Sequence, residues 1–360
     1  MQLPSLQQVK ELRLSEGEAF VACGGFEDRA VELPRLVAPP GDRQATAIVL
    51  KYRPHDKRNR LQEVCDQLSH KSLAVVPLTY HRHEPGPFDS SLAQALDTAQ
   101  ARSVCLDISG MSRLAIIIAM DVVREQNLPL RLVYAEAETY GPSREEFEEA
   151  KANERQHLPT SFIYTGVHDV VRVARLSSVR MQSHAPVLIA FDSFNEALCQ
   201  ALVNVINPCR FLLINGRPPR EELRWREDAT AYVHRRLRQE WSVEHDNDPP
   251  KTTSTLWYEE TYALLAELYW RFSAHHRIIL APTGSKLQTV SSYLLRAVHS
   301  DIHIEYPVVG GFFSDRYSSG VHATWQLSFG RMGDFVDGLR AQDLWTNLRL
   351  PKEPVDVDIP

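Results

Sequence analysis

The sequence has little that would tie the chain to a membrane or to a polyanion. Its longest apolar run, LAIIIAM at residues 114–120, is far too short to span a bilayer. Residues 1–18 lack a basic region followed by an apolar one, so we expect no signal peptide. The formal net charge of −6 provides no overall positive field to hold duplex DNA or RNA. Membranes and duplex nucleic acid are therefore not expected partners.

Cysteine and histidine show no disulfide or metal pattern. The five cysteines are odd in number and form no CxxC pair, which favours a reducing cytosol over a disulfide framework. The histidine clusters at 81–83 and 275–276 lack the spacing and the carboxylate of an HExxH site. We therefore expect a cytoplasmic protein without a bound metal.

Short β-branched runs alternate with longer helix-like runs, which is typical of βαβ units and a parallel sheet. The strand candidates are residues 18–23, 45–52, 72–78, 103–109 and 129–136 in the first half, and residues 186–191, 210–215, 242–245, 277–282 and 301–307 in the second. Helix candidates lie between them, among them residues 111–126, 221–240 and 286–298. The sequence therefore predicts an α/β protein.

The two halves share landmarks in the same order, which predicts an internal duplication. Arg-Pro follows the second strand of each half, and Ser/Thr-Gly with a basic residue follows the fourth. A Gly-Val-His triplet recurs at 166–168 and 320–322. We expect two tandem Rossmann-like domains with mainly parallel five-stranded sheets, each closed by its Gly-Val-His strand or hairpin. The domains are residues 1–180 and 181–345, and residues 346–360 form a C-terminal tail.

The loop after the first strand, CGGFEDRA, is a candidate binding loop, because ligands of parallel α/β sheets bind beyond the carboxyl ends of the strands. Gly24 and Gly25 let the backbone approach a ligand, and Phe26 follows them. The start of the next helix favours an anion, and Arg29 could clamp a phosphate or pair with Glu27. A tight turn before a capped helix is the alternative.

The loop after the fourth strand carries the strongest local signal. Backbone N–H groups and hydroxyls can form an anion nest there, and a basic residue follows at the helix start. A cation at that end opposes the helix dipole unless an anion lies between them, so finding one in both halves favours a bound anion over a simple helix cap. The candidates are Asp107, Ser109, Gly110, Met111, Ser112 and Arg113 in the first half, and Thr283, Gly284, Ser285 and Lys286 in the second.

Further polar candidates follow other strands. Arg53 and Arg217 come after the second strand of each half, where an arginine could reach a ribose, phosphate or base, or could lie on the surface beside a proline turn. Glu136 could read hydroxyls or base edges, and Asp192 suits helix capping or hydroxyl recognition. His168 lies in the first Gly-Val-His triplet, where a structural hydrogen bond is the alternative to a functional role.

The motif Asp-x-Ser-Gly-x-Ser-Arg at 107–113 resembles that of CRISPR-associated Rossmann-fold (CARF) domains, and residues 283–286 are a shorter version. The resemblance implies paired Rossmann units that sense a cyclic oligonucleotide where their strand ends meet. A tandem duplication would supply both units in one chain. We find no nuclease, winged-helix or protease region in this sequence, so we expect a protein partner to supply the output.

Three functional hypotheses fit these residues. The first is a sensor that binds a nucleotide or another phosphorylated small molecule in a prokaryotic antiviral defence or stress system. The second is an enzyme that cleaves or transfers a phosphoester or glycosidic bond of a nucleotide, with Glu27, Asp107 or His168 as acid/base candidates. The third is a scaffold subunit of a larger complex. No Ser-His-Asp spacing, metal cluster or P-loop defines a reaction, so the catalytic residues stay unassigned and no cofactor is predicted besides the nucleotide-like ligand.

Overall fold

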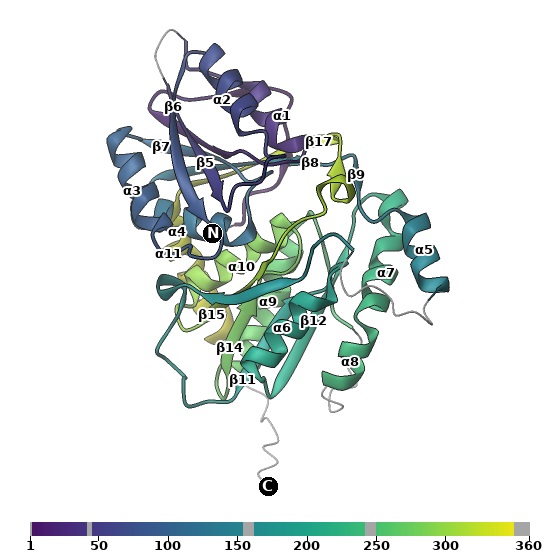
Figure 1. Cartoon of the computed structure of the whole chain (residues 1–360). Helices are drawn as coiled ribbons and strands as arrows, with labels where there is room; N and C mark the ends of the chain where they lie inside the picture. Colours follow the sequence, from purple (N-terminus) through teal and green to yellow (C-terminus); the bar gives the residue numbers. More distant parts are fainter. Residues whose placement is uncertain (1, 42–44, 154–161, 242–249, 349–360) are drawn as a thin grey trace.

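The structure is a computed structural model that describes residues 2–41, 45–153, 162–241 and 250–348. Two large sheets of mostly parallel strands are flanked by helices, which confirms the predicted α/β class (Figure 1). Within the described ranges, none of the helices is both long and apolar enough to cross a membrane.

The first sheet has seven strands. Five of them, from β8 to β6 along the sheet, are parallel; at one edge β17 pairs antiparallel with β8, and β1 pairs antiparallel with β17. In spatial order the strands are β1 (Gln7–Gln8), β17 (Ala323–Arg331), β8 (Pro129–Glu136), β7 (Ser103–Asp107), β3 (Glu18–Cys23), β5 (Ala45–Arg53) and β6 (Leu73–His81).

The second sheet has six strands, and its five parallel strands follow one another along the sheet in the same relative order. In space they are β10 (Val167–Arg172), β15 (His303–Val309), β14 (Arg277–Ala281), β11 (Pro186–Phe191), β12 (Arg210–Arg217) and β13 (Thr252–Ser254). The strand predicted at 242–245 lies outside the described residues, and β13 forms further along the chain, where no strand was predicted.

The closing strands are exchanged between the two sheets. β10 comes from the first half of the chain but pairs antiparallel with β15, and β17 comes from the second half but pairs antiparallel with β8. A short ladder between β9 (Thr139–Tyr140) and β16 (Ser318–Ser319) also joins the halves. β10 begins within the first Gly-Val-His triplet and β17 begins directly after the second, yet each strand extends the sheet of the other half. The sheets therefore have seven and six strands rather than the expected five.

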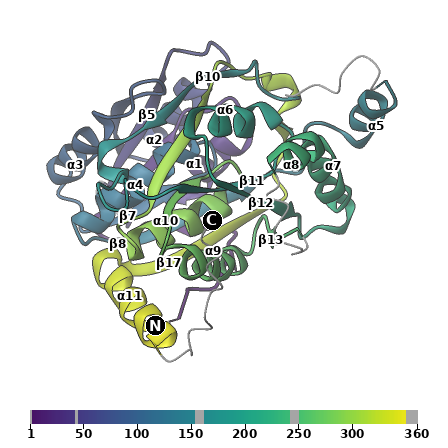
Figure 2. The same cartoon turned by 90° about the horizontal axis from the view of Figure 1, so that it is seen from below.

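Helices cover both faces of each sheet. α1 and α2 lie on the outer face of the first sheet, α6 to α8 lie on the outer face of the second, and the remaining long helices lie between the sheets (Figures 1 and 2). Their bounds are α1 (Arg29–Leu36), α2 (Leu61–His70), α3 (Phe88–Thr98), α4 (Arg113–Glu125), α6 (Glu196–Ile206), α7 (Trp225–Val233), α8 (Arg235–Trp241), α9 (Tyr258–Phe272), α10 (Lys286–Val298) and α11 (Met332–Leu348), with α5 (Arg144–Ala152) outside this layering. The single helix predicted at 221–240 is instead a 3-10 turn followed by α7 and α8.

One hydrophobic core fills the space between the sheets. Because side chains alternate along a strand, Val21 of β3 faces this core while Phe20 faces α1 and α2. In the same way, Ile189 of β11 faces the core and Leu188 faces α6. Every residue of α4 from Leu114 to Met120 is buried, since α4 packs against α3, α10 and α11. The two halves therefore share a core that neither could bury alone.

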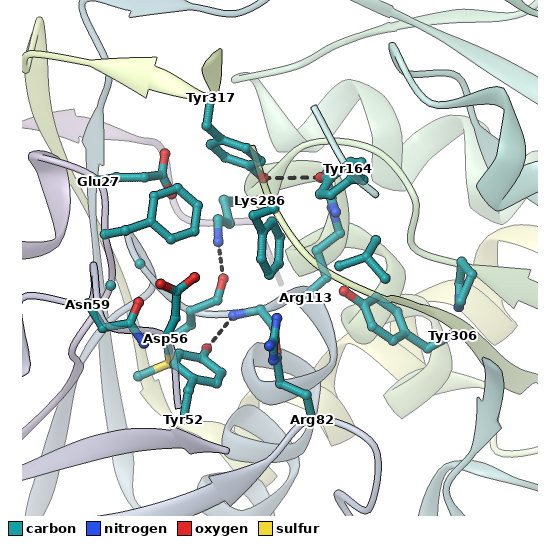
Figure 3. Close-up of a pocket in the computed structure, with 18 of the residues that line it drawn as sticks. Glu27, Tyr52, Asp56, Asn59, Arg82, Arg113, Tyr164, Lys286, Tyr306 and Tyr317 are labelled. Carbon is teal, nitrogen blue, oxygen red and sulfur yellow. Dashed lines mark hydrogen bonds between the residues drawn. The ribbon is translucent and has the colours of Figure 1, made fainter. Parts of the chain in front are cut away.

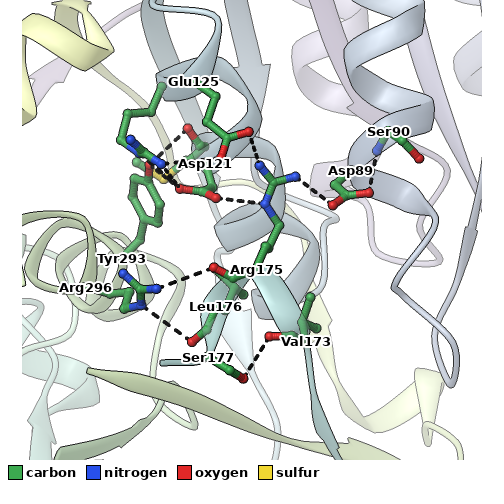
Figure 4. A network of polar contacts seen from close by, with 12 residues as sticks. Asp89, Ser90, Asp121, Glu125, Val173, Arg175, Leu176, Ser177, Tyr293 and Arg296 are labelled. Carbon is green, nitrogen blue, oxygen red and sulfur yellow. Dashed lines mark hydrogen bonds and ion pairs between the residues drawn. The ribbon is translucent and has the colours of Figure 1, made fainter. Parts of the chain in front are cut away.

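A polar network ties the crossing segment after β10 to this helical layer (Figure 4). Arg175 forms ion pairs with Asp89 of α3 (2.8 Å) and with Asp121 of α4 (2.8 Å), and it also contacts Glu125. Arg296 of α10 donates hydrogen bonds to backbone carbonyls of the same segment. The Asp121 side chain is only 9% exposed, so these contacts replace water around its carboxylate.

Replacing Arg175 with methionine should therefore lower the free energy of unfolding by about 2 kcal/mol, because it leaves a buried carboxylate short of one cation. Urea unfolding followed by circular dichroism measures this loss. Arg180→Met, at an exposed position of the same segment, is the matched control and should change stability by less than about 0.5 kcal/mol. Equal effects of the two substitutions would contradict a structural role for the network.

Candidate functional site

The loops after β7 and β14 end at similarly capped helices. Ser112 caps α4 by accepting a hydrogen bond from the Ala115 N–H (3.2 Å). Ser285 caps α10 by accepting one from the Gln288 N–H (3.1 Å). Neither helix has an acidic residue in its first turn, and each begins with a basic one.

These basic residues reach across to the opposite loop in a reciprocal way. Lys286 Nζ donates a hydrogen bond to the Met111 carbonyl, and Arg113 Nε donates one to the Gly284 carbonyl. The start of each helix is thus completed by a cation from the other half of the chain. The two predicted anion loops therefore lie together, and each one reaches the other.

Two adjacent pockets open at this junction, and both are lined by residues that follow the carboxyl ends of parallel strands. The pocket beside the start of α4, here the α4 pocket, has about 790 Å³ of empty space including its mouth, and the α10 pocket has about 1100 Å³. Arg113, Tyr164, Lys286 and Tyr317 line both pockets, so these four side chains form the wall between them. Other lining residues are Gly25, Phe26, Glu27, Tyr52, Arg82, Gly110, Met111, Ser112, Thr283, Tyr306 and Phe312 in the α4 pocket, and Arg29, Tyr134, Glu136, Tyr140, Asp192, Phe194, Gly216, Arg226, Gly284, Ser285 and Gln288 in the α10 pocket.

The surroundings of Lys286 disfavour its positive charge. Burial, together with the positive charges of Arg29 and Arg113, lowers the pKa of Lys286 to about 7. The dipole of α10 also disfavours a cation at its first residue. An anion bound against Lys286 would offset both effects, because it would restore a counter-charge beside the ammonium group.

The acidic residue of the first loop, Glu27, is held through one carboxylate oxygen, Oε2. Glu27 forms an ion pair with Arg29 (2.7 Å) and accepts a hydrogen bond from the Ser318 hydroxyl of β16. Arg29 donates in addition to Tyr134 Oη (3.2 Å). Because both charged partners are at least 93% buried, this pair fixes the start of α1 beside the wall.

Aromatic rings form one side of the α4 pocket (Figure 3). The Tyr164 and Tyr317 hydroxyls are 3.1 Å apart, and both rings pack against Phe312. The ring of Phe26 also lies 5.4 Å from that of Phe312, and the guanidinium of Arg82 lies over Phe312 at 5.2 Å. A planar ligand group could stack here while an anionic group lies near Lys286.

Most residues predicted from the sequence line one of the pockets. Those in the α4 pocket are Gly25, Phe26, Glu27, Gly110, Met111, Ser112, Arg113, Thr283 and Lys286. Those in the α10 pocket are Arg29, Arg113, Glu136, Asp192, Gly284, Ser285 and Lys286. The prediction from the loop motifs therefore selects residues that the fold brings together.

Four predicted residues lie outside both pockets for identifiable reasons. Gly24 has a packing role, since a Cβ atom there would lie 2.7 Å from the Leu61 backbone. Arg53 is exposed at the end of β5, and Arg217 pairs with the exposed Glu260 (2.9 Å). His168 stacks on His83 with ring centroids 3.8 Å apart. None of these four side chains lines the candidate site.

Asp107 and Ser109 also lie outside the pockets and hold the loop in shape. Asp107 accepts a hydrogen bond from the Ser109 N–H (2.8 Å), and the Ser109 hydroxyl accepts one from the Ala135 N–H (2.8 Å). Gly110 follows at a close approach, where a Cβ atom would lie 2.8 Å from Cys23 Sγ. Burial raises the pKa of Asp107 to about 7, so its carboxylate is a structural acceptor in an apolar setting.

Asp107→Asn should therefore stabilise the protein above neutral pH. An acid whose pKa is raised on folding, here from 3.8 to about 7, favours the folded state at low pH and loses that contribution as the pH rises to 7. Asparagine keeps the acceptor for the Ser109 N–H without the charge. We expect a gain of about 2–4 kcal/mol in unfolding free energy at pH 8, shrinking as the pH falls toward 4. Urea titrations at both pH values test this, and a variant less stable than wild type at pH 8 would contradict it.

Sequence reasoning missed several lining residues, including Tyr52, Arg82, Tyr164 and Tyr306. Tyr52 is the most informative, because its hydroxyl accepts a hydrogen bond from the Ser112 N–H (2.6 Å). Tyr52 comes one residue before Arg53, which the sequence analysis selected instead. Side chains alternate between the two faces of a strand, so Tyr52 is buried where Arg53 is exposed, and this alternation could have indicated Tyr52. Among the described residues, no group of three or more His, Cys, Asp or Glu side chains is placed to hold a metal ion.

Comparison with known proteins gives only distant likenesses. No family model and no curated protein matches this chain. Among solved structures, a functionally unknown protein, PA1789 of Pseudomonas aeruginosa PAO1, aligns at 9% identity and a TM-score of 0.24, covering 91% of this chain and 97% of its own. Can2 from Sulfobacillus thermosulfidooxidans, in complex with cyclic tetra-adenylate, aligns at 10% identity and a TM-score of 0.24, covering 80% of this chain and 95% of its own. At scores this low, neither likeness bears on the function of this chain.

Proposed function

We propose that this protein binds a phosphorylated, nucleotide-like ligand, with the phosphate in the α4 pocket against Lys286, Arg113 and the start of α4. The reciprocal crossing of Lys286 and Arg113 carries this proposal. Two cations converge at helix starts that have no acidic residue in their first turns, and an anion is the partner that this arrangement lacks. Tyr164 and Tyr317, which line both pockets, place aromatic rings beside these cations for the planar part of the ligand.

We further propose that the two halves are duplicated Rossmann-like units, as the sequence predicts. Three observations support this: the common strand order of the two sheets, the exchanged closing strands, and the matched contacts at α4 and α10. Ligands of such units bind beyond the carboxyl ends of the strands, where both pockets lie.

A sensing role fits the site better than turnover. Glu27 is held by Arg29 and Ser318, and Asp107 and His168 lie outside both pockets. The three acid/base candidates are therefore engaged or remote. The resemblance of residues 107–113 to the CARF motif suggests a setting in prokaryotic antiviral defence or a stress response, in the cytoplasm, with a protein partner that supplies the output.

A ligand panel tests this function. Pyrophosphate, nucleoside mono- and diphosphates, and cyclic and linear oligonucleotides are added to the wild-type chain, and the melting temperature is measured. A ligand at about 100 times its Kd should add roughly 2.7 kcal/mol to the stability, and chromatography should recover it unchanged. If no phosphorylated compound raises the melting temperature at millimolar concentration, the proposal is wrong, and recovery of a cleaved ligand would favour the enzyme.

A further inference from the structure

The two pockets differ at the helix starts. In the α10 pocket, Gln288 Oε1 accepts a hydrogen bond from the Ser285 N–H (2.8 Å), which completes a capping box. The Gln288 amide lies against Gly284, in the space that a Cβ atom there would need. The equivalent position of α4 is Ala115, which has no side chain to fold back. A neutral amide from within α10 therefore covers the start of α10, whereas at α4 the N-cap N–H is taken by the Tyr52 hydroxyl from β5.

Two of the three arginines that line the α10 pocket, Arg226 and Arg29, are already held by other partners. Arg226 donates to the backbone carbonyls of Tyr140 (2.9 Å), Gly141 (2.8 Å) and Pro142 (2.9 Å). Arg29 is paired with Glu27, as described above. These two guanidinium groups line the pocket, but their contacts to other partners make them poor binding groups for an anion.

In contrast to these arginines, the carboxylate of Asp192 in the α10 pocket has an oxygen that receives no ordinary hydrogen bond. Asp192 Oδ1 accepts a hydrogen bond from the Gly216 N–H (2.9 Å). Asp192 Oδ2 has no hydrogen bond of ordinary geometry among the described residues; the Thr230 side chain lies beside the carboxyl group, and the nearest cation, Arg238 Nη2, is 3.7 Å away. The side chain is 1% exposed and lines the pocket. A buried acceptor without a donor is costly, so a ligand that brings N–H groups to Asp192 would be favoured.

Planar side chains accompany this acceptor. The ring of Phe194, two residues after Asp192, lines the pocket, and the Arg226 guanidinium lies over it at 4.5 Å. Tyr140 lines the pocket as well. An aromatic heterocycle with N–H donors on one edge matches both the planar surroundings and the free carboxylate oxygen.

We propose that the α10 pocket recognises the base of the ligand, that Asp192 is the residue that determines base specificity, and that the base is guanine. This inference rests on the proposed binding of a nucleotide-like ligand. Guanine offers two adjacent donors, N1–H and the N2 amine, to a carboxylate, whereas adenine offers only its N6 amine on the corresponding edge. The phosphate lies across the shared wall, beside Lys286.

Isothermal titration of wild type with GMP, IMP and AMP tests this proposal, with pyrophosphate and guanosine as separate probes of the two pockets. IMP lacks only the N2 amine. We expect GMP to bind about 10-fold more tightly than IMP, which offers one donor fewer to the carboxylate, and IMP more tightly than AMP, whose N1 presents a lone pair to it. Asp192→Asn keeps the acceptor for the Gly216 N–H but replaces Oδ2 by a donor, so the GMP-to-IMP ratio should fall to about 1, with pyrophosphate binding unchanged. Asp228→Asn, at an exposed position of α7 outside both pockets, is the matched control and should keep the preference.

The outcomes separate this inference from the proposed function. Pyrophosphate binding with equal affinities for GMP, IMP and AMP in wild type would overturn base recognition and leave the phosphate site standing. An Asp192→Asn variant that keeps the preference for GMP would overturn the role of Asp192. Absence of pyrophosphate binding would overturn the phosphate site, and the guanosine titration then decides on the base pocket by itself. The wild-type comparison stands even if the variant fails to fold.

Discussion

Lys286→Gln should reduce the affinity for pyrophosphate about 30- to 100-fold, which corresponds to roughly 2–3 kcal/mol. Lys286 lines both pockets and reaches the Met111 carbonyl from the opposite half of the chain. A bound phosphate would accept a charge-assisted hydrogen bond from this ammonium group, and glutamine can supply only a neutral one. Isothermal titration of wild type and variant measures the difference.

The same substitution should leave the unliganded protein at least as stable as wild type. The pKa of Lys286 is lowered to about 7 by burial and by Arg29 and Arg113, so removing its charge relieves a cost of folding. Lys57→Gln, which removes an exposed lysine, is the control and should change the affinity less than twofold. A variant that binds pyrophosphate as wild type does would show that the phosphate does not contact Lys286, and a strongly destabilised variant would mean that the lysine is structural.

Separating the halves should abolish folding of each one. We expect a fragment of residues 1–182 and a fragment of residues 183–360 to be unfolded or insoluble when produced alone, and to form a folded 1:1 complex when produced together. The first fragment contains β10 without its partner β15, and the second contains β17 without its partner β8. The buried surfaces of α4 and α10 would also face water.

Circular dichroism and size-exclusion chromatography of the fragments, alone and co-produced, test this expectation. The intact chain is the reference for the melting transition. A fragment that unfolds cooperatively as a monomer would show that one half carries a sufficient core, contrary to the shared core described here. The result also bears on the predicted boundary near residue 180, because domains that fold only together are not independent units.

The sequence predicted local structure well because its signals are local. The run at residues 18–23 became β3 and the pattern at 286–298 became α10 without a shift in bounds. The pairing of the closing strands could not be predicted in this way, because alternation at 167–172 marks a strand but says nothing about which sheet it joins. The exchange is decided by the shared core and the crossing segment, which are properties of the whole chain.

The candidate site shows the same difference between features set by local sequence and features set by the whole chain. The helix starts at Ser112 and Ser285 and the cations that follow them were visible as motifs. Asp107 was chosen as a ligand contact because it stands at a strand end, yet it turns back to the Ser109 N–H, as a short acidic side chain in a turn often does. Tyr164 and Tyr306 enter the α4 pocket from segments far apart in sequence, so no motif could group them.

The structure of the chain with bound guanosine diphosphate tests the central claim most directly. We predict that the phosphates lie in the α4 pocket, within hydrogen-bond distance of Lys286 Nζ and of the first backbone N–H groups of α4, with the base in the α10 pocket beside Asp192. Phosphates bound away from the junction of α4 and α10, or an unchanged empty junction at millimolar ligand, would contradict it.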